Sequence, residues 1–122
     1  MTHQVQDFSI HAGDDLIIPV TVTEDGTPTG TPVDITGALL IVWALSTREG
    51  TVTRVLTKTL GEGLEVTDAP GGVFEVTIDT EDTRDLSGRY QHQARITDSG
   101  GSKSTVMSGL VTVDPTILED AE

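Results

Sequence analysis

The sequence predicts an all-β protein whose short strands pack as two antiparallel sheets. Apolar and polar residues alternate along segments such as 15–24 and 73–79, and this period of two is typical of strands with one buried face. Turn-forming residues interrupt the chain at short intervals, as in Glu24-Asp25-Gly26 and Asp98-Ser99-Gly100-Gly101, which leaves room for strands rather than long helices. No cysteine is present among the 122 residues, so the fold must rest on an apolar core.

The alternation and the turns predict roughly seven to nine strands in a single domain over 1–114, followed by an acidic tail over 115–122. One helical turn is expected over 81–86, with Asp79 or Thr80 capping its first amides. The expected strands are 6–11, 15–24, 37–47, 51–60, 64–67, 73–79, 89–97 and 103–113.

The aromatic residues are few, and their positions indicate which kind of sandwich this is. The stretch Asp85-Leu86-Ser87-Gly88-Arg89-Tyr90 leads into an alternating strand. In an immunoglobulin-like sandwich, a Tyr at the start of the penultimate strand packs inward and its hydroxyl bonds backbone a few residues upstream. The single Trp lies in the apolar run 39–45, where the third strand of such a sandwich is expected. We therefore predict an immunoglobulin-like β-sandwich with Trp43, Phe74, Tyr90 and a hydrogen-bonded His92 in its core.

The run 39–45 departs from strict alternation, because both faces of that strand are apolar. This indicates that its outer face, with Leu40, Val42 and Ala44, is covered. The cover is either the preceding loop 27–32 or a second subunit. We regard these three residues, together with Phe8, Ile117 and Leu118, as candidate interface residues.

The charge balance narrows the classes of partner. The 20 Asp and Glu outnumber the 7 Lys and Arg, and a net charge of −13 disfavours nucleic acid and anionic lipid. All seven positive side chains lie between Arg48 and Lys103. The simplest explanation is a solubilising surface; a sharper one is that the acidic ends bind the basic middle of a neighbouring copy, or a separate basic partner. No apolar segment has the length of a signal peptide or membrane span, so we expect a soluble protein made in a cytoplasm.

Residue patterns that carry chemistry are lacking. The histidines His3, His11 and His92 have no metal-ligand spacing, and no Ser lies in a nucleophile motif. The sequence therefore predicts a protein without catalytic residues or cofactor. Calcium is the one ligand left open, because four carboxylates lie within seven residues, although helix capping is the favoured explanation for them: Asp79, Glu81, Asp82 and Asp85.

Two segments carry a resemblance to a family. Residues 7–14 place a Gly-Asp pair, Gly13 and Asp14, five residues after Phe8, and Pro32-Val33-Asp34-Ile35-Thr36-Gly37-Ala38 precedes the Trp strand. Gly13 permits a strained bend, Asp34 can accept hydrogen bonds from Thr36, and Gly37 can take a positive φ. This pattern resembles small immunoglobulin-like structural proteins of tailed bacteriophages, including the phage baseplate upper protein family. One departure from true immunoglobulin domains is that His92 replaces the cysteine two residues after the Tyr.

The resemblance implies a non-enzymatic virion protein, synthesised in the bacterial host cytoplasm and attached as a capsid decoration or a tail or baseplate accessory. Its partners would be the major capsid, tail or baseplate proteins, with a homo-oligomer as a further option. A glycan- or cell-surface-binding module is the alternative, but the predicted loops contain no Trp or Tyr with which to stack on a sugar.

Overall fold

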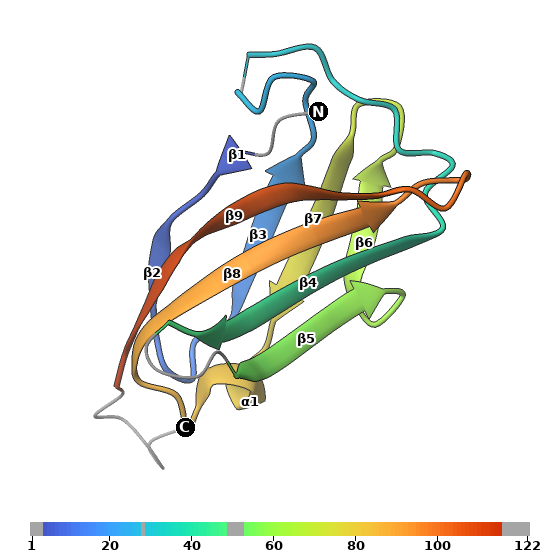
Figure 1. The fold of residues 1–122 in the computed structure, drawn as a ribbon. Coiled ribbons are helices and arrows are strands. Elements are labelled where there is room, and N and C mark those ends of the chain that lie inside the picture. Colours follow the sequence, from blue (N-terminus) through green and yellow to red (C-terminus); the bar gives the residue numbers. More distant parts are fainter. Residues whose placement is uncertain (1–3, 28, 49–52, 116–122) are drawn as a thin grey trace.

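The computed structural model describes residues 4–27, 29–48 and 53–115, which form nine strands and one helical turn (Figure 1). The helical turn α1 spans Thr80–Thr83. The strands are β1 (Gln4–Val5), β2 (Phe8–His11), β3 (Leu16–Thr21), β4 (Leu40–Thr47), β5 (Arg54–Leu60), β6 (Gly63–Asp68), β7 (Val73–Ile78), β8 (Gly88–Thr97) and β9 (Lys103–Asp114).

The strands form two layers, as Figure 1 shows. The front sheet runs β1 and β2, then β9, β8, β4 and β5, and the back sheet runs β6, β7 and β3. A tight turn at Gly61 and Glu62 joins the layers where β5 passes into β6. The strand order matches an immunoglobulin-like sandwich with an added strand beside the third, as in variable-type domains. The predicted fold class is confirmed.

The first predicted strand differs from the expectation of antiparallel pairing. The predicted strand 6–11 corresponds to β2, a separate short strand, β1, precedes it, and both run parallel to β9. Between them, the Asp7 carboxylate accepts a hydrogen bond from the backbone N–H of Leu110 at 2.8 Å. The side chain therefore supplies an acceptor to the edge of β9 at the point where the N-terminal strand is interrupted.

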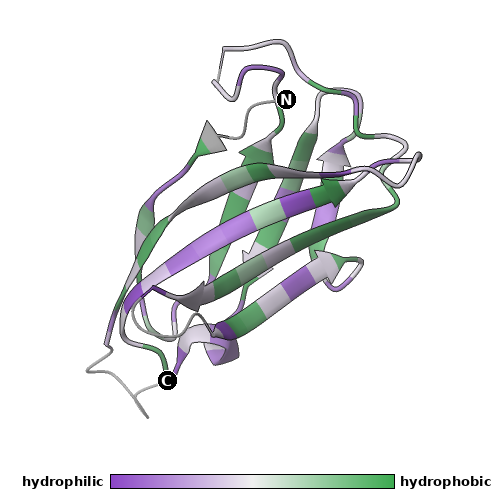
Figure 2. Cartoon of the chain, in the orientation of Figure 1, coloured by the Kyte–Doolittle hydropathy of each residue, from purple (hydrophilic) through white to green (hydrophobic). Residues whose placement is uncertain are grey.

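The core lies between the sheets and follows the predicted alternation. In Figure 2, β4 is coloured mostly hydrophobic and its neighbour β8 mostly hydrophilic, because β8 carries glutamine and arginine at every second position. The inner residues of both sheets are almost fully buried, and each large side chain contributes about 1.5–3 kcal/mol by leaving water. They include Val20, Ile41, Trp43, Leu45, Phe74, Val76, Ile78, Ala94, Met107, Val111 and Val113.

The chain reversal before β8 has the predicted tyrosine contact. The Tyr90 hydroxyl donates to the Ser87 carbonyl at 3.0 Å and accepts from the Ser87 N–H at 3.2 Å. Gly88 has φ +104°, which a side chain would disfavour. Helix α1 is shorter than the predicted 81–86. Asp79 is the N-cap residue of α1, as predicted, and the Asp79 backbone N–H donates to the Asp82 carboxylate at 2.8 Å.

The loop 27–32 does not cover Leu40, Val42 and Ala44, so that prediction is wrong for the described part of the loop. Instead, the loop folds back on the end of β3: Thr23 pairs with Pro32, and the Glu24 N–H donates to the Thr31 carbonyl at 3.0 Å. The Asp34 turn forms as predicted, since its carboxylate accepts from the Thr36 N–H at 2.9 Å. Gly37, however, does not have a positive φ, whereas Gly13 does, at +89°.

Candidate functional site

The outer face of the front sheet, here called the front face, combines apolar and basic side chains. Along β4 it presents Leu40, Val42 and Ala44, which lie opposite Thr97, Arg95 and Gln93 of β8. Leu40 is 42% exposed, and the residues to either side of Val42 and Ala44 in sequence are fully buried. The apolar outer residues of β4 thus form a strip that is open to a partner.

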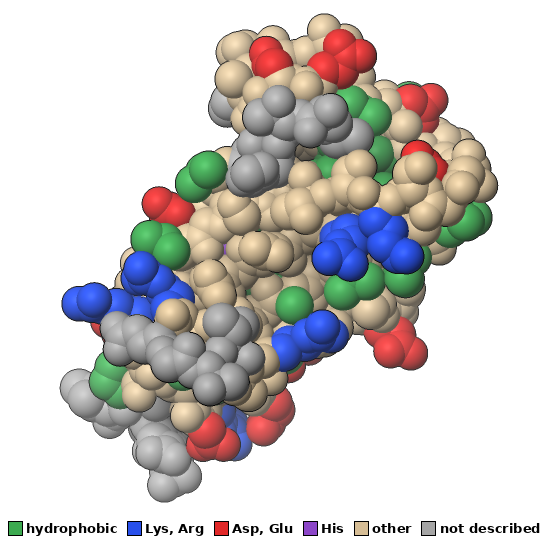
Figure 3. Space-filling model, in the orientation of Figure 1, with side chains coloured by type: hydrophobic (Ala, Val, Ile, Leu, Met, Phe, Trp, Pro, Cys, Tyr) green, Lys and Arg blue, Asp and Glu red, His purple; other side chains and the backbone are tan. Residues whose placement is uncertain are grey.

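Positive charge surrounds this strip. Figure 3 looks onto this face and shows Lys and Arg side chains spread over it, with hydrophobic side chains between them. The strands of the front sheet contain a single acidic residue, Asp114, at the end of β9. A protein of net charge −13 therefore has one face whose local charge is opposite to that of the whole. The exposed basic residues on it are Arg54, Arg89, Arg95 and Lys103.

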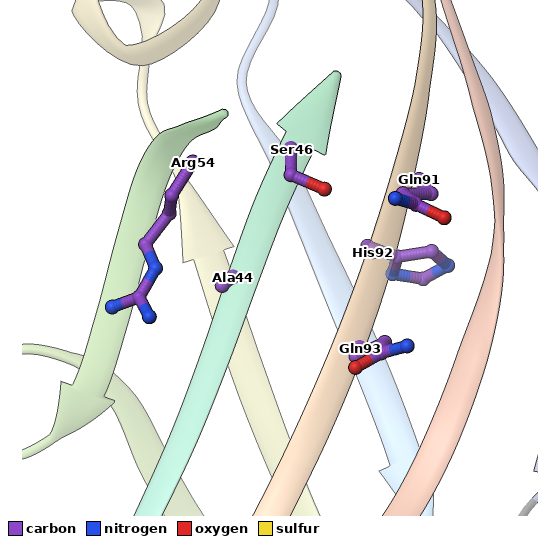
Figure 4. A pocket seen from close by; sticks show the side chains of 6 residues that line it. All are labelled: Ala44, Ser46, Arg54, Gln91, His92 and Gln93. Atoms are coloured by element: carbon purple, nitrogen blue, oxygen red, sulfur yellow. The ribbon is translucent and has the colours of Figure 1, made fainter. Parts of the chain in front are cut away.

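The front face is hollowed between β5, β4 and β8. One hollow has a volume of about 310 Å³. Figure 4 shows the side chains that line it, with the Arg54 guanidinium, Ser46 and the amides of Gln91 and Gln93 around Ala44. A second hollow shares Ala44, Arg54 and Gln93 and continues over the strip; its remaining lining is Leu40, Val42, Arg95, Thr97 and Lys103. Together they form one trough, which offers hydrogen-bond donors, positive charge and apolar floor to a partner.

The inner side of the same sheet is organised around His92. The Trp43 indole N–H donates to His92 Nδ1 at 3.0 Å, so Nδ1 is the acceptor, and His92 Nε2 then donates to the Gln6 carbonyl at 2.5 Å. The Phe8 ring packs edge-on against the imidazole with centroids 5.1 Å apart. Burial lowers the pKa of His92, while the Gln6 hydrogen bond and the charge of Asp7 partly oppose this. The imidazole is thus a neutral bridge between β4 and the N-terminal segment.

Gly109 makes this bridge possible. A Cβ at this position would collide with the Gln6 carbonyl oxygen and lie 2.8 Å from His92 Nε2. The lack of a side chain in β9 therefore lets the N-terminal segment approach the buried histidine. Both ring nitrogens are engaged, so His92 is not available as a base or a ligand.

The structure distributes the residues predicted from sequence between core and surface. Trp43, Phe74, Tyr90 and His92 lie in the core. Of the candidate interface residues, Leu40, Val42 and Ala44 lie on the front face, whereas Phe8 is half-buried and packed against the core. Ile117 and Leu118 lie outside the described residues.

The acidic segment around α1 does not form the calcium site considered above. The Asp82 carboxylate contacts Lys58 Nζ at 2.7 Å, and the Glu81 carboxylate contacts the Arg84 guanidinium at 3.3 Å. Within the described ranges, no three His, Cys, Asp or Glu side chains are grouped to hold a metal ion. In the same part of the chain, no helix is both long and apolar enough to span a membrane.

The basic residues of the front face were not singled out from sequence. Arg89, Gln91, Gln93 and Arg95 occupy every second position of β8 and therefore lie on the same side of the strand, which makes that side polar. Their meeting with Arg54 and Lys103 depends on the pairing of β5, β4, β8 and β9. Sequence spacing alone does not supply that strand order.

Comparisons with known proteins add a resemblance in shape. No protein-family model and no curated protein sequence matches the chain. Among solved structures, the chain is similar to a structure of murine CRIg, at 11% sequence identity and a TM-score of 0.45, over 90% of this chain and 92% of that one. The fold described above rests on its own strand order and tyrosine contact.

Proposed function

We propose that this protein is a non-enzymatic structural protein of a bacteriophage virion. It is made in the host cytoplasm and attaches to the particle, as a capsid decoration or a tail or baseplate accessory, by surface complementarity. The observation that carries this proposal is the front face, where an open apolar strip is edged by Arg54, Arg95 and Lys103 on a strongly acidic protein. The phage-like segments 7–14 and 32–38 support the context, since Gly13 and Asp34 form specific bends there.

The chemistry of the trough favours binding over catalysis. Its polar side chains are the guanidiniums of Arg54 and Arg95, the Lys103 ammonium, glutamine amides and hydroxyls, all of which can donate hydrogen bonds to acceptors on a partner. The commonest general bases are histidine and carboxylates: no Asp or Glu is among the described residues that line the trough, and the ring of its histidine is hydrogen-bonded in the core. Display of many copies on a symmetric particle would make modest individual contacts sufficient.

Electron microscopy of purified virions tests the proposal directly. With a tag on this chain, we expect gold label at fixed positions on the head, tail or baseplate. Arg95→Glu should reduce the label at least tenfold, because it places a carboxylate beside the apolar strip. Arg84→Glu is the matched control, since it makes the same change in net charge beside α1 and should keep the label. If virions produced with the tagged, unsubstituted protein carry no label, the virion role is refuted.

A glycan- or cell-surface-binding module is a second candidate, because the Arg54 guanidinium and the Gln91 and Gln93 amides could hydrogen-bond sugar hydroxyls. Among the described residues, however, Trp43, Tyr90 and Phe74 are turned into the core, so the trough has no aromatic platform. Binding of the unmodified protein on a glycan array, lost in Gln93→Ala, would favour this candidate over the first.

A further inference from the structure

The outer face of the back sheet, here called the back face, has the opposite charge to the front face. On it, Glu65 of β6 lies opposite Glu75 of β7, and Glu75 lies opposite Pro19 of β3. The neighbouring Ile17 is 55% exposed. Neither β3, β6 nor β7 contains a Lys or Arg. This face therefore pairs exposed apolar residues with carboxylates.

The juxtaposition of Glu65 and Glu75 is unfavourable in a single copy. Residues directly opposite each other on adjacent antiparallel strands have Cβ atoms about 5 Å apart, and like charges there repel. No basic side chain belongs to these strands to offset that repulsion. A basic group from outside the chain would convert the two carboxylates from a local cost into a binding feature.

We propose that the back face of one copy is the partner of the front face of the next, so that copies associate head to tail. Arg95 and Lys103 beside Leu40 match Glu65 and Glu75 beside Ile17 in charge and in apolar content. The two faces lie on opposite sides of the sandwich, so they cannot meet within one chain. A pair joined in this way keeps one front face and one back face free, so further copies can add until a ring closes or a row continues.

The inference rests on the proposed function only in taking the front face as a binding surface, and it names a second copy as the occupant. A stable interface removes about 800 Å² from each partner, roughly a ninth of the 7045 Å² accessible surface of this chain. At about 0.15 M salt the screening length is about 8 Å, so the net charge of −13 opposes association weakly while close contacts persist.

Sedimentation over a concentration series at this salt tests the proposal. The weight-average mass of the parent protein should rise with concentration. Arg95→Glu and Glu75→Lys should each weaken association at least tenfold, whereas the controls Arg84→Glu and Glu24→Lys, which change net charge equally but lie off both faces, should not. Mixing the Arg95→Glu protein with the Glu75→Lys protein should restore association, because each then offers the face that the other lacks.

Three outcomes would overturn the proposal: a parent protein that stays monomeric at the highest concentration, association unaffected by Glu75→Lys, or no restoration on mixing. Glu65→Lys provides a second back-face variant if Glu75→Lys does not fold, as judged by the near-ultraviolet circular dichroism of Trp43. The virion experiment is independent of this one. Label missing from particles with self-association intact would refute only the virion role, and monomers that still label particles would refute only head-to-tail contact.

Discussion

The two faces of strand β8 differ completely in what surrounds them, although their residues alternate along one segment. Tyr90, His92, Ala94 and Ile96 point into the core, while Arg89, Gln91, Gln93 and Arg95 point outward. The inner residues are packed and hydrogen-bonded within the chain. On the outer side the Gln91 amide donates to the Thr47 carbonyl at 3.3 Å, whereas the side chains of Arg89, Gln93 and Arg95 are exposed to a partner. We infer that the inward-facing residues of this strand serve stability and the outward-facing ones serve binding. Substitutions at neighbouring positions should therefore affect the free energy of unfolding in one case and binding in the other.

The largest loss of stability is expected where a side chain is added on the inner side of the front sheet. Gly109→Ala should lower the free energy of unfolding by about 3 kcal/mol, because the new Cβ would displace the Gln6 carbonyl from His92. Urea unfolding followed by Trp43 fluorescence measures this loss. Gly37→Ala is the control: its Cβ would meet only ordinary contacts near Ser99, at 3.6 Å and beyond. Equal effects of the two substitutions would contradict the tight fit assigned to Gly109.

Lowering the pH should reduce the free energy of unfolding through protonation of His92 in the unfolded chain. Burial holds the folded-state pKa of His92 below its ordinary value of 6.5, so as pH falls the unfolded chain takes up the proton first. The free energy of unfolding should therefore be independent of His92 above pH 6.5. Below that pH it should decline, by up to about 1.4 kcal/mol per pH unit, until the lowered folded-state pKa is reached.

Denaturant unfolding between pH 7.5 and 5 measures this decline, with His92→Gln as the reference. The glutamine amide can accept from the Trp43 indole and donate to the Gln6 carbonyl, but it does not titrate. The variant should lose less stability toward pH 5 than the parent, since all other titrating groups are shared. Parallel curves for the two proteins would show that His92 does not control the pH dependence.

The sequence was enough to predict what depends on local pattern. Alternation located eight of the strands. The position of Tyr90 at the start of the penultimate strand predicted a hydroxyl contact with backbone a few residues upstream, and the structure places that contact at Ser87. What it missed depends on long-range pairing. The parallel docking of β1 and β2 on β9 requires Gly109 and Gln6 to meet, and these residues are far apart in sequence. The basic trough likewise needs β5 and β8 on either side of β4.

A smaller loss of stability is expected at Lys58, a basic residue that lies on the inner side of the front sheet. Lys58 of β5 is in register with Trp43, and its Nζ contacts the Asp82 carboxylate at 2.7 Å, with side-chain exposures of 13% and 18%. Lys58→Met keeps the apolar stem but leaves Asp82 partly buried without that cation. We expect a loss of about 1 kcal/mol in thermal or urea unfolding. Glu81→Gln, in a pair whose carboxylate side chain is 76% exposed, should change stability by less than about 0.5 kcal/mol. If Glu81→Gln lost more stability than Lys58→Met, the Lys58–Asp82 pair would not be the more stabilising of the two.

The smallest expected effect is a gain, on the outer side of the back sheet. Glu75→Gln removes one of two carboxylates that face each other across β6 and β7, so the isolated chain should become more stable by about 0.2–1 kcal/mol. Urea unfolding at protein concentrations low enough to exclude association isolates this term, and added salt should shrink the difference, because it screens the repulsion that is removed. Glu62→Gln, in the turn between β5 and β6, serves as the control and should be neutral. If Glu75→Gln instead destabilises the dilute monomer, the carboxylate has a favourable contact within its own chain, and the case for an external basic partner loses its energetic basis.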